Sequence, residues 1–405
     1  MAIVTWPDKK KICILIGQLI WHGFEYPTNL FWPASVRYFW PFNILAKLVS
    51  FGIVLQKLLS KANTFKTCPI SQNMLGVFGR VIGANCVGGI ERLLYSDWHC
   101  SVFMSQEGAC VFCDSEEFLL PCEPRQFCSN TSNLFILSES GNILSFSKSQ
   151  HLITTANTPP FRSIAANDDE LYCISKDEVL FVYPLNNFPD SPNASLPLSM
   201  KIKNVACGPG FALFLTHSGA VFSKGIGTRG QLGHGDLETR MTPELIAALT
   251  PVTVTAIACG SWHSVCLTDT GDIYTWGSNE FGQLGHPSLN LERSRNLNDP
   301  LLSSPACINL SALPVPVDLP EDVSIVAIAC GSRHTACLSE HKELLAFGWN
   351  GFGQLGFDVE PQEMPGRYPH REASDKVNRI ILPFPYHSEL SLSCGSWCTI
   401  VREVE

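Results

Sequence analysis

The chain has 405 residues, which is enough for two or three ordinary domains or for one large repeat fold. Hydrophobic residues make up 45% of it and charged residues only 16%, so the composition allows a large buried core. The formal net charge of −9 argues against a nonspecific grip on nucleic acid, because that grip needs a basic surface that releases counterions.

The 17 cysteines are an odd number, and several recur beside a glycine at matching places. Cysteine in such a place behaves as a small buried hydrophobic residue. We therefore interpret the cysteines as reduced and expect an intracellular protein of the nucleus and cytoplasm. Cys110 and Cys113 have CxxC spacing, but they lie on a predicted strand with no second ligand pair nearby, so no metal site is expected there.

Residues 1–72 differ in composition from everything after them. They contain apolar runs at 12–21 and 44–59, and the second run is shorter than the ~20 residues that a bilayer-spanning helix needs. The first run follows three lysines at 9–11 and resembles the apolar part of a signal peptide, without a convincing cleavage site. We expect a poorly ordered or spuriously translated extension. Helices that anchor to a membrane or partner, and a targeting segment, are the alternatives.

The remainder, residues 73–405, is built from copies of one strand-rich unit. The clearest copies are VACGPGFALFLTHSGAVFSKGIGTRGQLGH at 205–234, IACGSWHSVCLTDTGDIYTWGSNEFGQLGH at 257–286 and IACGSRHTACLSEHKELLAFGWNGFGQLGF at 328–357. An alternating apolar run, a tight turn and a second run predict a β-hairpin. One hairpin is not stable alone in water, so the copies must pack against one another.

Weaker copies precede the clear ones, at 96–113, 127–148 and 163–183. Residues 73–89 are typical of the outer strand of a blade that lacks its first half, and residues 392–401 of the inner half of a blade that lacks its end. The sequence therefore predicts an all-β, seven-bladed β-propeller whose ring closes by pairing of the N- and C-terminal strands. Closure removes the exposed edge strands that an open array would leave.

Two segments interrupt the repeat. Thr242 and Pro243 resemble the N-cap and first residue of a helix, so one or two helical turns are expected up to Leu249. The longest insertion, 287–321, is rich in Asn, Ser, Pro and Leu without a clear period, and we expect a surface loop there.

The glycines of the repeat fall into two groups. One group follows cysteine at the predicted start of an inner strand, where a Cβ would clash near the axis: Gly208, Gly260, Gly331 and Gly395. The other group brackets Gln-Leu in turns that are predicted to need positive φ: Gly230, Gly233, Gly282, Gly285, Gly353 and Gly356. Packing between blades is predicted for the enclosed leucines (Leu232, Leu284 and Leu355) and for Trp276, which Phe347 replaces in the next copy.

Two motifs resemble parts of enzymes, and each has a simpler interpretation. Residues 225–230 match GxGxxG, but Gln-Leu-Gly follows them instead of the helix that a dinucleotide site needs. Ser261 and His263 share one face of a strand, and Ser332 and His334 repeat the pair. A recurring pair indicates a hydrogen bond between blades rather than a catalytic centre. We expect no enzyme activity, no catalytic residue, no metal and no cofactor.

The pattern ACGxxH…TxxG…Y/FxWGxNxxGQLG resembles the regulator of chromosome condensation (RCC) repeat family of seven-bladed propellers. The resemblance is specific over the clear copies and the C-terminus and weak over 96–188. GQLGHGDLETRMTPELIAAL, GSWHSVCLTDTGDIYTWG and the insertion ending ALPVPVDLP resemble the RCC domain-containing protein one subfamily. This resemblance implies a non-enzymatic, chromatin-linked adaptor that binds a Jumonji-C oxygenase, or a histone or other chromatin protein.

The founding member of the family exchanges guanine nucleotide on a small nuclear GTPase. A guanine nucleotide exchange factor is therefore the alternative function. The founding member works through a β-wedge and rim residues, which cannot be placed on this chain because the second and third repeats are too degenerate. No direct contact with nucleic acid is expected, and membrane contact would involve only residues 1–72.

The third residue after the repeat cysteine is equivalent from blade to blade, and rotation about one axis places such residues in a ring on one face. They are Gly210, Trp262, Arg333 and Trp397, with Trp98 assigned to the matching place in the first blade. Trp and Arg are enriched in binding hot spots, so Trp98, Trp262, Arg333 and Trp397 are the predicted partner-binding residues. The alternative is that these side chains pack between blades and that the insertion 287–321 binds the partner.

Overall fold

The structure is a computed structural model, which describes residues 77–79, 92–114, 116–156, 158–189, 201–295, 307–357, 373–382, 384 and 388–404. The chain divides into two units, Met1–Thr67 and Cys68–Glu405. The expected extension, 1–72, lies outside the described residues, so its character stays a prediction. Among the residues that the structure describes, no helix is long and apolar enough to span a bilayer.

Regular structure in the second unit is almost all β-strand, as the alternating apolar runs predict. The strands are β1 (Val77–Gly79), β2 (Arg92–Ser96), β3 (Cys100–Ser105), β4 (Gly108–Cys113), β5 (Glu116–Leu119), β6 (Pro124–Ser129), β7 (Asn133–Ser138), β8 (Ile143–Ser147), β9 (Leu152–Thr155), β10 (Phe161–Ala166), β11 (Glu170–Ser175), β12 (Leu180–Pro184), β13 (Ile202–Gly208), β14 (Phe211–Thr216), β15 (Val221–Gly225), β16 (Arg240–Leu245), β17 (Val254–Cys259), β18 (His263–Thr268), β19 (Ile273–Ser278), β20 (Leu310–Pro316), β21 (Ile325–Cys330), β22 (His334–Ser339), β23 (Glu343–Trp349), β24 (Ala373–Ile381), β25 (Leu390–Cys394) and β26 (Cys398–Glu403). The helices are η2 (Leu185–Asn187), η3 (Ala247–Leu249) and α3 (Leu289–Arg295).

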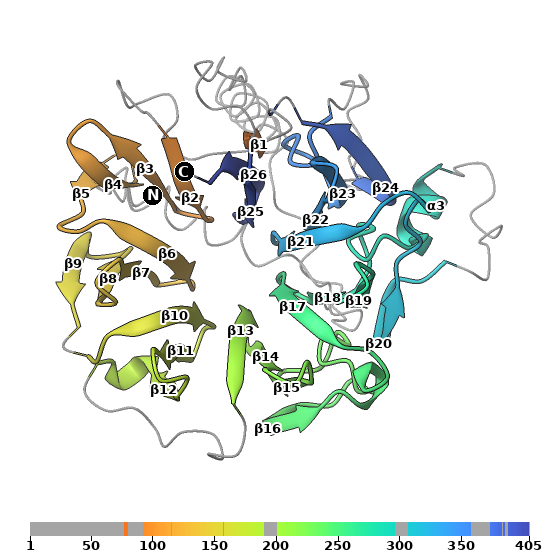
Figure 1. Ribbon diagram of the computed structural model, residues 1–405, viewed down its shortest axis with the longest axis horizontal. Coiled ribbons are helices and arrows are strands. Elements are labelled where there is room, and N and C mark those ends of the chain that lie inside the picture. Colours follow the sequence, from red (N-terminus) through yellow and green to blue (C-terminus); the bar gives the residue numbers. More distant parts are fainter. Residues whose placement is uncertain are drawn as a thin grey trace, which may run out of the picture. The chain divides into compact units, whose positions relative to one another are not determined.

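Within the described part of the chain, the strands form seven antiparallel sheets arranged around a common centre (Figure 1). We call these sheets blades 1 to 7 in chain order. Blade 1 is β2–β5, blade 2 is β6–β9, blade 3 is β10–β12, blade 4 is β13–β16, blade 5 is β17–β20 and blade 6 is β21–β24. Blade 7 is composite, with the order β1-β26-β25. The predicted class, an all-β propeller, is confirmed.

The second strand of a blade is buried on both of its faces. All six residues of β14, β18 and β22 are buried, so these strands read as continuous apolar or small-residue runs. The hairpin turns have the predicted chemistry: Gly271 has φ +86°, and the Thr268 hydroxyl accepts the Asp272 N–H at 3.1 Å. Such turns fix the register of the strands that they join.

The hydrophobic core lies between the blades rather than within them. Seven clusters of buried side chains each join two blades that are consecutive around the ring. Trp276 is fully buried between blades 4 and 5, and Phe347 takes its place between blades 5 and 6. Leu93 of blade 1 packs in the same cluster as Cys398 and Ile400 of blade 7. Burial of this kind stabilises a blade only when its neighbours are present.

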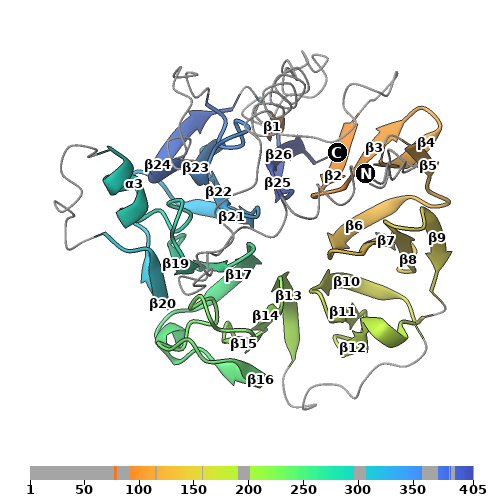
Figure 2. The same cartoon turned by 180° about the vertical axis from the view of Figure 1, so that it is seen from behind.

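The two ends of the propeller unit meet in blade 7. β1 pairs with β26 from Val77–Ile400 to Gly79–Cys398, and the two strands lie side by side when seen from the front and from behind (Figures 1 and 2). This is the pairing on which the predicted ring closure depends.

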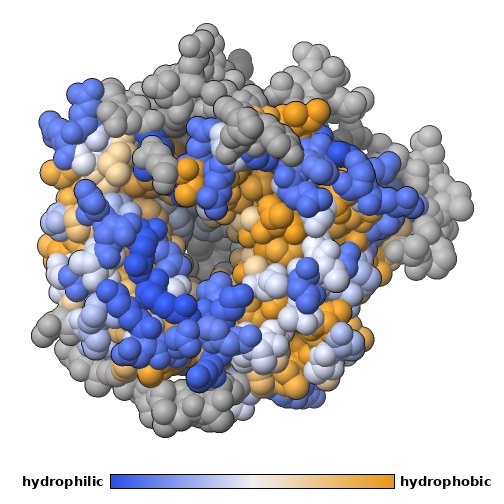
Figure 3. Space-filling view, in the orientation of Figure 1, coloured by the Kyte–Doolittle hydropathy of each residue, from blue (hydrophilic) through white to orange (hydrophobic). Residues whose placement is uncertain are grey.

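Basic side chains at the start of the first strands add polar contacts between blades 2 to 5. The guanidinium of Arg125 donates to the Arg162 carbonyl at 2.7 Å, Arg162 to the Lys203 carbonyl at 2.9 Å, and Lys203 Nζ to the Thr255 carbonyl at 3.1 Å. Figure 3 shows a hollow at the centre of the sheets, with hydrophilic residues gathered over β10 and hydrophobic residues over β17 and β21. The two halves of the ring therefore differ in polarity on this face.

Three local expectations are wrong. The segment that begins at Thr242 and Pro243 was expected to be helical, but it lies in the outermost strand β16, and only the short η3 follows. The insertion 287–321 was expected to be a loop, but it contains α3 and the outermost strand β20. Both strands carry proline, which an edge strand tolerates because one side of it is unpaired. The cysteine–glycine pairs end the innermost strand instead of starting it, as Cys259 does in β17.

Candidate functional site

The turn between the first and second strands of each blade lies close to the next blade. A Cβ added to Gly208 would lie 2.4 Å from the Gly260 carbonyl oxygen, and one on Gly260 would lie 2.7 Å from the Gly331 oxygen. A Cβ on Gly331 would lie 2.8 Å from the Gly395 oxygen, and one on Gly395 would lie 1.9 Å from that of Ser96. Each glycine of blades 4 to 7 thus allows the close approach of the following blade.

The Gly-Gln-Leu-Gly turns give blades 4, 5 and 6 a second contact with the blade that follows. All six of their glycines have positive φ, between +71° and +83°, which a residue with a Cβ rarely adopts. The Gln231 carbonyl accepts the Ser264 hydroxyl of the next blade at 2.8 Å. The same bond joins Thr335 to the Gln283 carbonyl and Thr399 to the Gln354 carbonyl, each at 2.8 Å. The buried leucines Leu232, Leu284 and Leu355 lie within these turns.

The recurring histidines join the same network. His263 Nε2 lies 3.0 Å from Thr335 Oγ1, and His334 Nε2 lies 3.1 Å from Thr399 Oγ1. Because each threonine hydroxyl donates to a glutamine carbonyl, its oxygen accepts from the histidine, so Nε2 carries the proton. Burial, with the charge of His334 added for His263, lowers the pKa of His263 to about 3, and burial lowers that of His334 to about 4. Both imidazoles are neutral blade-to-blade donors.

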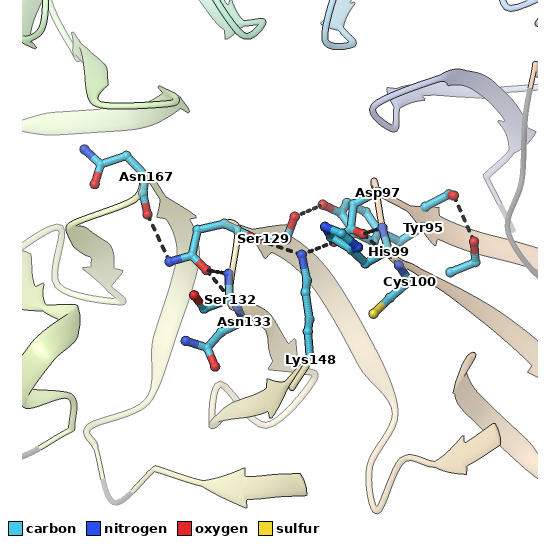
Figure 4. A network of polar contacts seen from close by, with 12 residues as sticks. Tyr95, Asp97, His99, Cys100, Ser129, Ser132, Asn133, Lys148 and Asn167 are labelled. Carbon is cyan, nitrogen blue, oxygen red and sulfur yellow. Dashed lines mark hydrogen bonds and ion pairs between the residues drawn. The ribbon is translucent and has the colours of Figure 1, made fainter. Parts of the chain in front are cut away.

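Blades 1 to 3 replace the glycine by a residue whose side chain closes the turn. Asp97 Oδ1 accepts the His99 and Cys100 N–H groups at 2.7 and 2.8 Å, and Asn130 and Asn167 close their turns in the same way. Lys148 joins two of these turns (Figure 4). Its Nζ lies 2.8 Å from Asp97 Oδ2 and donates to the Asn130 carbonyl at 2.6 Å. This ion pair is buried between blades 1 and 2, where removal of one partner would leave an unpaired charge.

The register of blade 1 places Trp98 one residue away from its predicted position. The Asp97 N–H donates to the Cys100 carbonyl, just as the Gly260 N–H donates to the His263 carbonyl. His99 is therefore the equivalent of Trp262, and Trp98 is the equivalent of the serine before it. The prediction was wrong here because blade 1 lacks the Cys-Gly pair that anchors the alignment, with Asp97 in place of the glycine.

The remaining predicted residues take part in a repeated contact that the sequence interpretation missed. The residue just before each Gly-Gln-Leu-Gly turn packs against the residue of the next blade that lies third after the repeat cysteine. The Arg229 guanidinium lies 5.7 Å from the Trp262 ring centre, and that of Arg333 lies 4.6 Å from the Phe281 ring centre. Phe352 and Trp397 have ring centres 6.0 Å apart. These distances are typical of cation–π and aromatic contacts.

Trp397 is the centre of an aromatic cluster that joins blades 6, 7 and 1. Its ring centre lies 4.4 Å from that of Trp98 and 4.6 Å from that of Trp349, both edge-on. Trp397 is only 9% exposed, so for this residue the packing alternative describes the structure. Trp98, Phe352 and Trp262 are 50%, 40% and 39% exposed. We call the whole set the aromatic–arginine face: Trp98, Arg229, Trp262, Phe281, Arg333, Trp349, Phe352 and Trp397.

Arg333 is half-buried on this face. Burial lowers the pKa of its guanidinium, and the charge of Glu280 opposes that effect. Arg229 forms a 2.7 Å ion pair with the same Glu280. The aromatic–arginine face therefore combines two cations, one carboxylate and exposed aromatic rings across blades 4 to 6. The missed residues Arg229, Phe281 and Phe352 had a signal in the sequence, since they occupy one repeat-equivalent position.

The motifs that resemble enzyme or metal sites have other surroundings. Residues 225–230 end β15 and enter a turn without the helix that a dinucleotide site needs. Cys110 packs in the cluster between blades 7 and 1, and Cys113 in the cluster between blades 1 and 2, so the CxxC pair points to opposite faces of its sheet. Within the described ranges, Cys113, Asp114 and His151 are the group whose ligand atoms could hold a metal ion.

Comparison with known proteins places this architecture. Residues 218–267 and 270–338 match the family model described as "Regulator of chromosome condensation (RCC1) repeat", and a second model of that description matches 254–283 and 325–354. The β-propeller thus contains segments that match RCC1 repeats, and over them the chain is similar to the RCC1-repeat proteins.

Individual proteins show the same similarity. The chain is 36% identical to human RCC1 domain-containing protein 1 and 34% identical to the mouse protein of that name, each over 226 residues. The aligned region covers 51% of this chain and 57% or 56% of the relative, so the chain spans just over half the length of these proteins. The solved structure of Prp20p from Saccharomyces cerevisiae is 15% identical with a TM-score of 0.60, over 83% of this chain and 93% of that one. Human WBSCR16 is 16% identical with a TM-score of 0.56, over 76% and 86%. These structures are alike in fold.

Proposed function

We propose that the protein is a non-enzymatic protein–protein interaction scaffold that binds its partner through the aromatic–arginine face. The observation that carries this proposal is the exposure of Trp98, Trp262 and Phe352 beside Arg229 and Arg333 on one set of turns. Large aromatic and arginine side chains are the residues that dominate binding energy at protein interfaces. A surface that only had to stay soluble would expose fewer of them.

The polar groups that recur in the repeat support a scaffold over an enzyme. His263 and His334 are buried and donate to the next blade, and Thr335 and Thr399 are bonded to the glutamine carbonyls. A general base must reach a proton of the substrate, and these imidazoles face threonine instead. Their role in holding blades together is incompatible with turnover at the same atoms.

In finer terms, the scaffold is a chromatin-linked adaptor that binds a Jumonji-C oxygenase, or a histone or other chromatin protein, in the nucleus and cytoplasm. Identity of 34–36% to RCC1 domain-containing protein 1 supports a shared role for the aligned half. Prp20p has binding properties toward Gsp1p and histones, which supports protein partners for this fold. The described cysteines are free thiols, which suits a reducing compartment.

Guanine nucleotide exchange on a small GTPase is the second candidate. Its support is the binding of Prp20p, a protein of the same fold, to Gsp1p. A nucleotide-release assay separates the two functions. The scaffold proposal predicts no acceleration of release across a panel of nuclear and cytoplasmic GTPases, and acceleration on any of them would replace it.

Binding is tested by affinity capture of a purified Jumonji-C oxygenase and of purified histones. Trp98→Ala and Trp262→Ala should each reduce capture. Leu152→Ala in β9 is the matched control, because Leu152 is 52% exposed on the outermost strand of blade 2. Equal capture by all three variants would show that the aromatic–arginine face does not bind the partner.

A further inference from the structure

Three potential metal ligands come together where the third strands of blades 1 and 2, β4 and β8, end. Cys113 ends β4, Asp114 follows it, and His151 lies in the turn between β8 and β9. The Cys113 sulfur, an Asp114 carboxylate oxygen and a His151 ring nitrogen all lie within 4.8 Å of one another. His151 Nε2 is 3.4 Å from Asp114 Oδ2. Cysteine, histidine and aspartate in this arrangement are the ligand types that bind zinc.

A second carboxylate holds the other side of the imidazole. His151 Nδ1 lies 3.3 Å from Glu116 Oε2, so the ring has one nitrogen toward Glu116 and the other toward Asp114. In zinc proteins, a carboxylate on the far nitrogen fixes the tautomer and orientation of the metal-binding histidine. Glu116 has that position here and would accept the Nδ1 proton, leaving Nε2 free for the metal.

The imidazole is also fixed by packing. Its ring is parallel to that of Phe146, with an interplanar angle of 4° and centres 6.3 Å apart, and its centre lies 5.3 Å from that of Phe118. The backbone φ angles of His151 and Asp114 are +52° and +49°, in a region that residues other than glycine rarely adopt. Together these features hold the half-buried His151 and the exposed Asp114 beside the buried sulfur of Cys113.

We propose that Cys113, Asp114 and His151 bind one zinc ion, with Glu116 orienting His151. Tetrahedral zinc with bonds of about 2.1 Å separates a nitrogen and an oxygen ligand by about 3.4 Å. The observed Nε2–Oδ2 distance is also 3.4 Å, so little movement is needed. Binding replaces the S–H bond of Cys113 by a sulfur–zinc bond and releases the proton to solvent. The fourth position is open to water or to a side chain of a partner.

The same residues have a different chemistry without a metal. A protonated imidazole between Asp114 and Glu116 would form an exposed ion-pair cluster, which contributes little to stability because solvent screens it. Zinc requires neutral imidazole and thiolate, so proton and metal compete for the site. The ion-pair alternative predicts no stoichiometric metal uptake and no involvement of Cys113.

For the test, the full chain is first reduced and freed of metal by a chelator. It is then titrated with Co²⁺, and afterwards with Zn²⁺ in competition with a chromophoric chelator. We expect one Co²⁺ per chain with a thiolate-to-cobalt absorption band, displaced by one Zn²⁺. His151→Gln and Cys113→Ser should lose both signals. His217→Gln is the matched control and should retain them, because His217 is an exposed turn histidine that also pairs with a carboxylate, that of Glu178 at 3.1 Å, outside the proposed site.

Thermal unfolding provides a second readout that separates binding from folding. Zinc should raise the melting temperature of the wild type and of His217→Gln by a few degrees and leave that of His151→Gln unchanged. Without metal, His151→Gln should melt with the wild type. The proposal is overturned if the wild type takes up no stoichiometric metal. It is also overturned if His151→Gln binds the metal as well as the wild type does, since other cysteines would then be the ligands.

Discussion

Trp276→Ala is the substitution for which the structure predicts the largest loss of stability. Trp276 is fully buried in β19 and belongs to the cluster between blades 4 and 5 with Leu213, Ile246 and Cys266. Removal of a buried tryptophan ring costs about 3–5 kcal/mol, because apolar contacts are lost and a cavity is left. The indole Nε1 also donates to the Gln231 carbonyl at 2.9 Å. That carbonyl keeps its bond from a serine hydroxyl, so it is not left without a donor.

The assay is equilibrium urea unfolding followed by circular dichroism. Trp262→Ala is the control, since Trp262 is 39% exposed and should cost about 1 kcal/mol or less. The loss of stability in Trp276→Phe should lie between those of Trp276→Ala and Trp262→Ala. Phe347 naturally occupies the same position in blade 6, so only the indole hydrogen bond and some volume are lost. A free energy of unfolding for Trp276→Ala within about 1 kcal/mol of the wild type would refute the packing argument. So would equal losses in Trp276→Ala and Trp262→Ala.

Three further predictions concern pH, closure and the N-terminus. His263 and His334 have folded-state pKa values of about 3 and about 4, below the ~6.5 of unfolded histidine, so the unfolded chain binds more protons in between. Stability should be complete above about pH 6.5 and fall as the pH drops from there toward 4, by about 1.4 kcal/mol per unit and histidine. His263→Phe, which imitates Phe211 of blade 4, should halve the slope of unfolding free energy against pH, and an unchanged slope would contradict the assignment. Removal of residues 390–405 should unpair β1, expose two strand edges and cause aggregation in size-exclusion chromatography, whereas a monomer with unchanged melting temperature would show that the ends do not join. A chain that begins at Asn73 should keep the full β signal in circular dichroism, and loss of soluble folding would show that residues 1–72 belong to the core.

The inner strands could be predicted because the same residue types recur at equivalent positions in several copies of the repeat. The cysteine–glycine pairs and the Gly-Gln-Leu-Gly turns recur at equivalent places, and the recurrence of Ser261 and His263 argued for a bond between blades. In the structure His263 makes that bond to the next blade through Thr335. Half-units at the two ends led to the composite blade 7, whose β1 and β26 are paired. Comparison of the repeats therefore indicated contacts between blades, which the sequence of a single hairpin does not reveal.

The outermost strands could not be predicted for a physical reason. β16 and β20 carry proline and have no fully buried residue, so neither composition nor alternation indicates a strand. Pairing with β15 and β19 decides their conformation, and that partner edge exists only after the inner strands have formed. The helix-starting preference of Thr242 and Pro243 contributes less free energy than the several backbone hydrogen bonds that pairing as a strand provides.

The candidate site was predicted in part. Trp262 and Arg333 lie where the repeat places them, but Trp98 was assigned one residue away and Trp397 is covered by its aromatic neighbours. The partners of these residues on the preceding blade had a visible signal just before each Gly-Gln-Leu-Gly turn. The group of Cys113 and His151 had none, because its members come from two blades and have no motif spacing.

The most direct test of the proposed function is the dissociation constant of a purified Jumonji-C oxygenase for the wild type and for Trp262→Ala and Arg333→Ala, measured by calorimetry. The account predicts that each substitution weakens binding about 30-fold or more, equivalent to ~2 kcal/mol, while the melting temperature changes little. Leu152→Ala should bind like the wild type. If Trp262→Ala and Arg333→Ala bind normally, or unfold early, the aromatic–arginine face is structural and the partner uses another surface, with the insertion 287–321 the next to be tested.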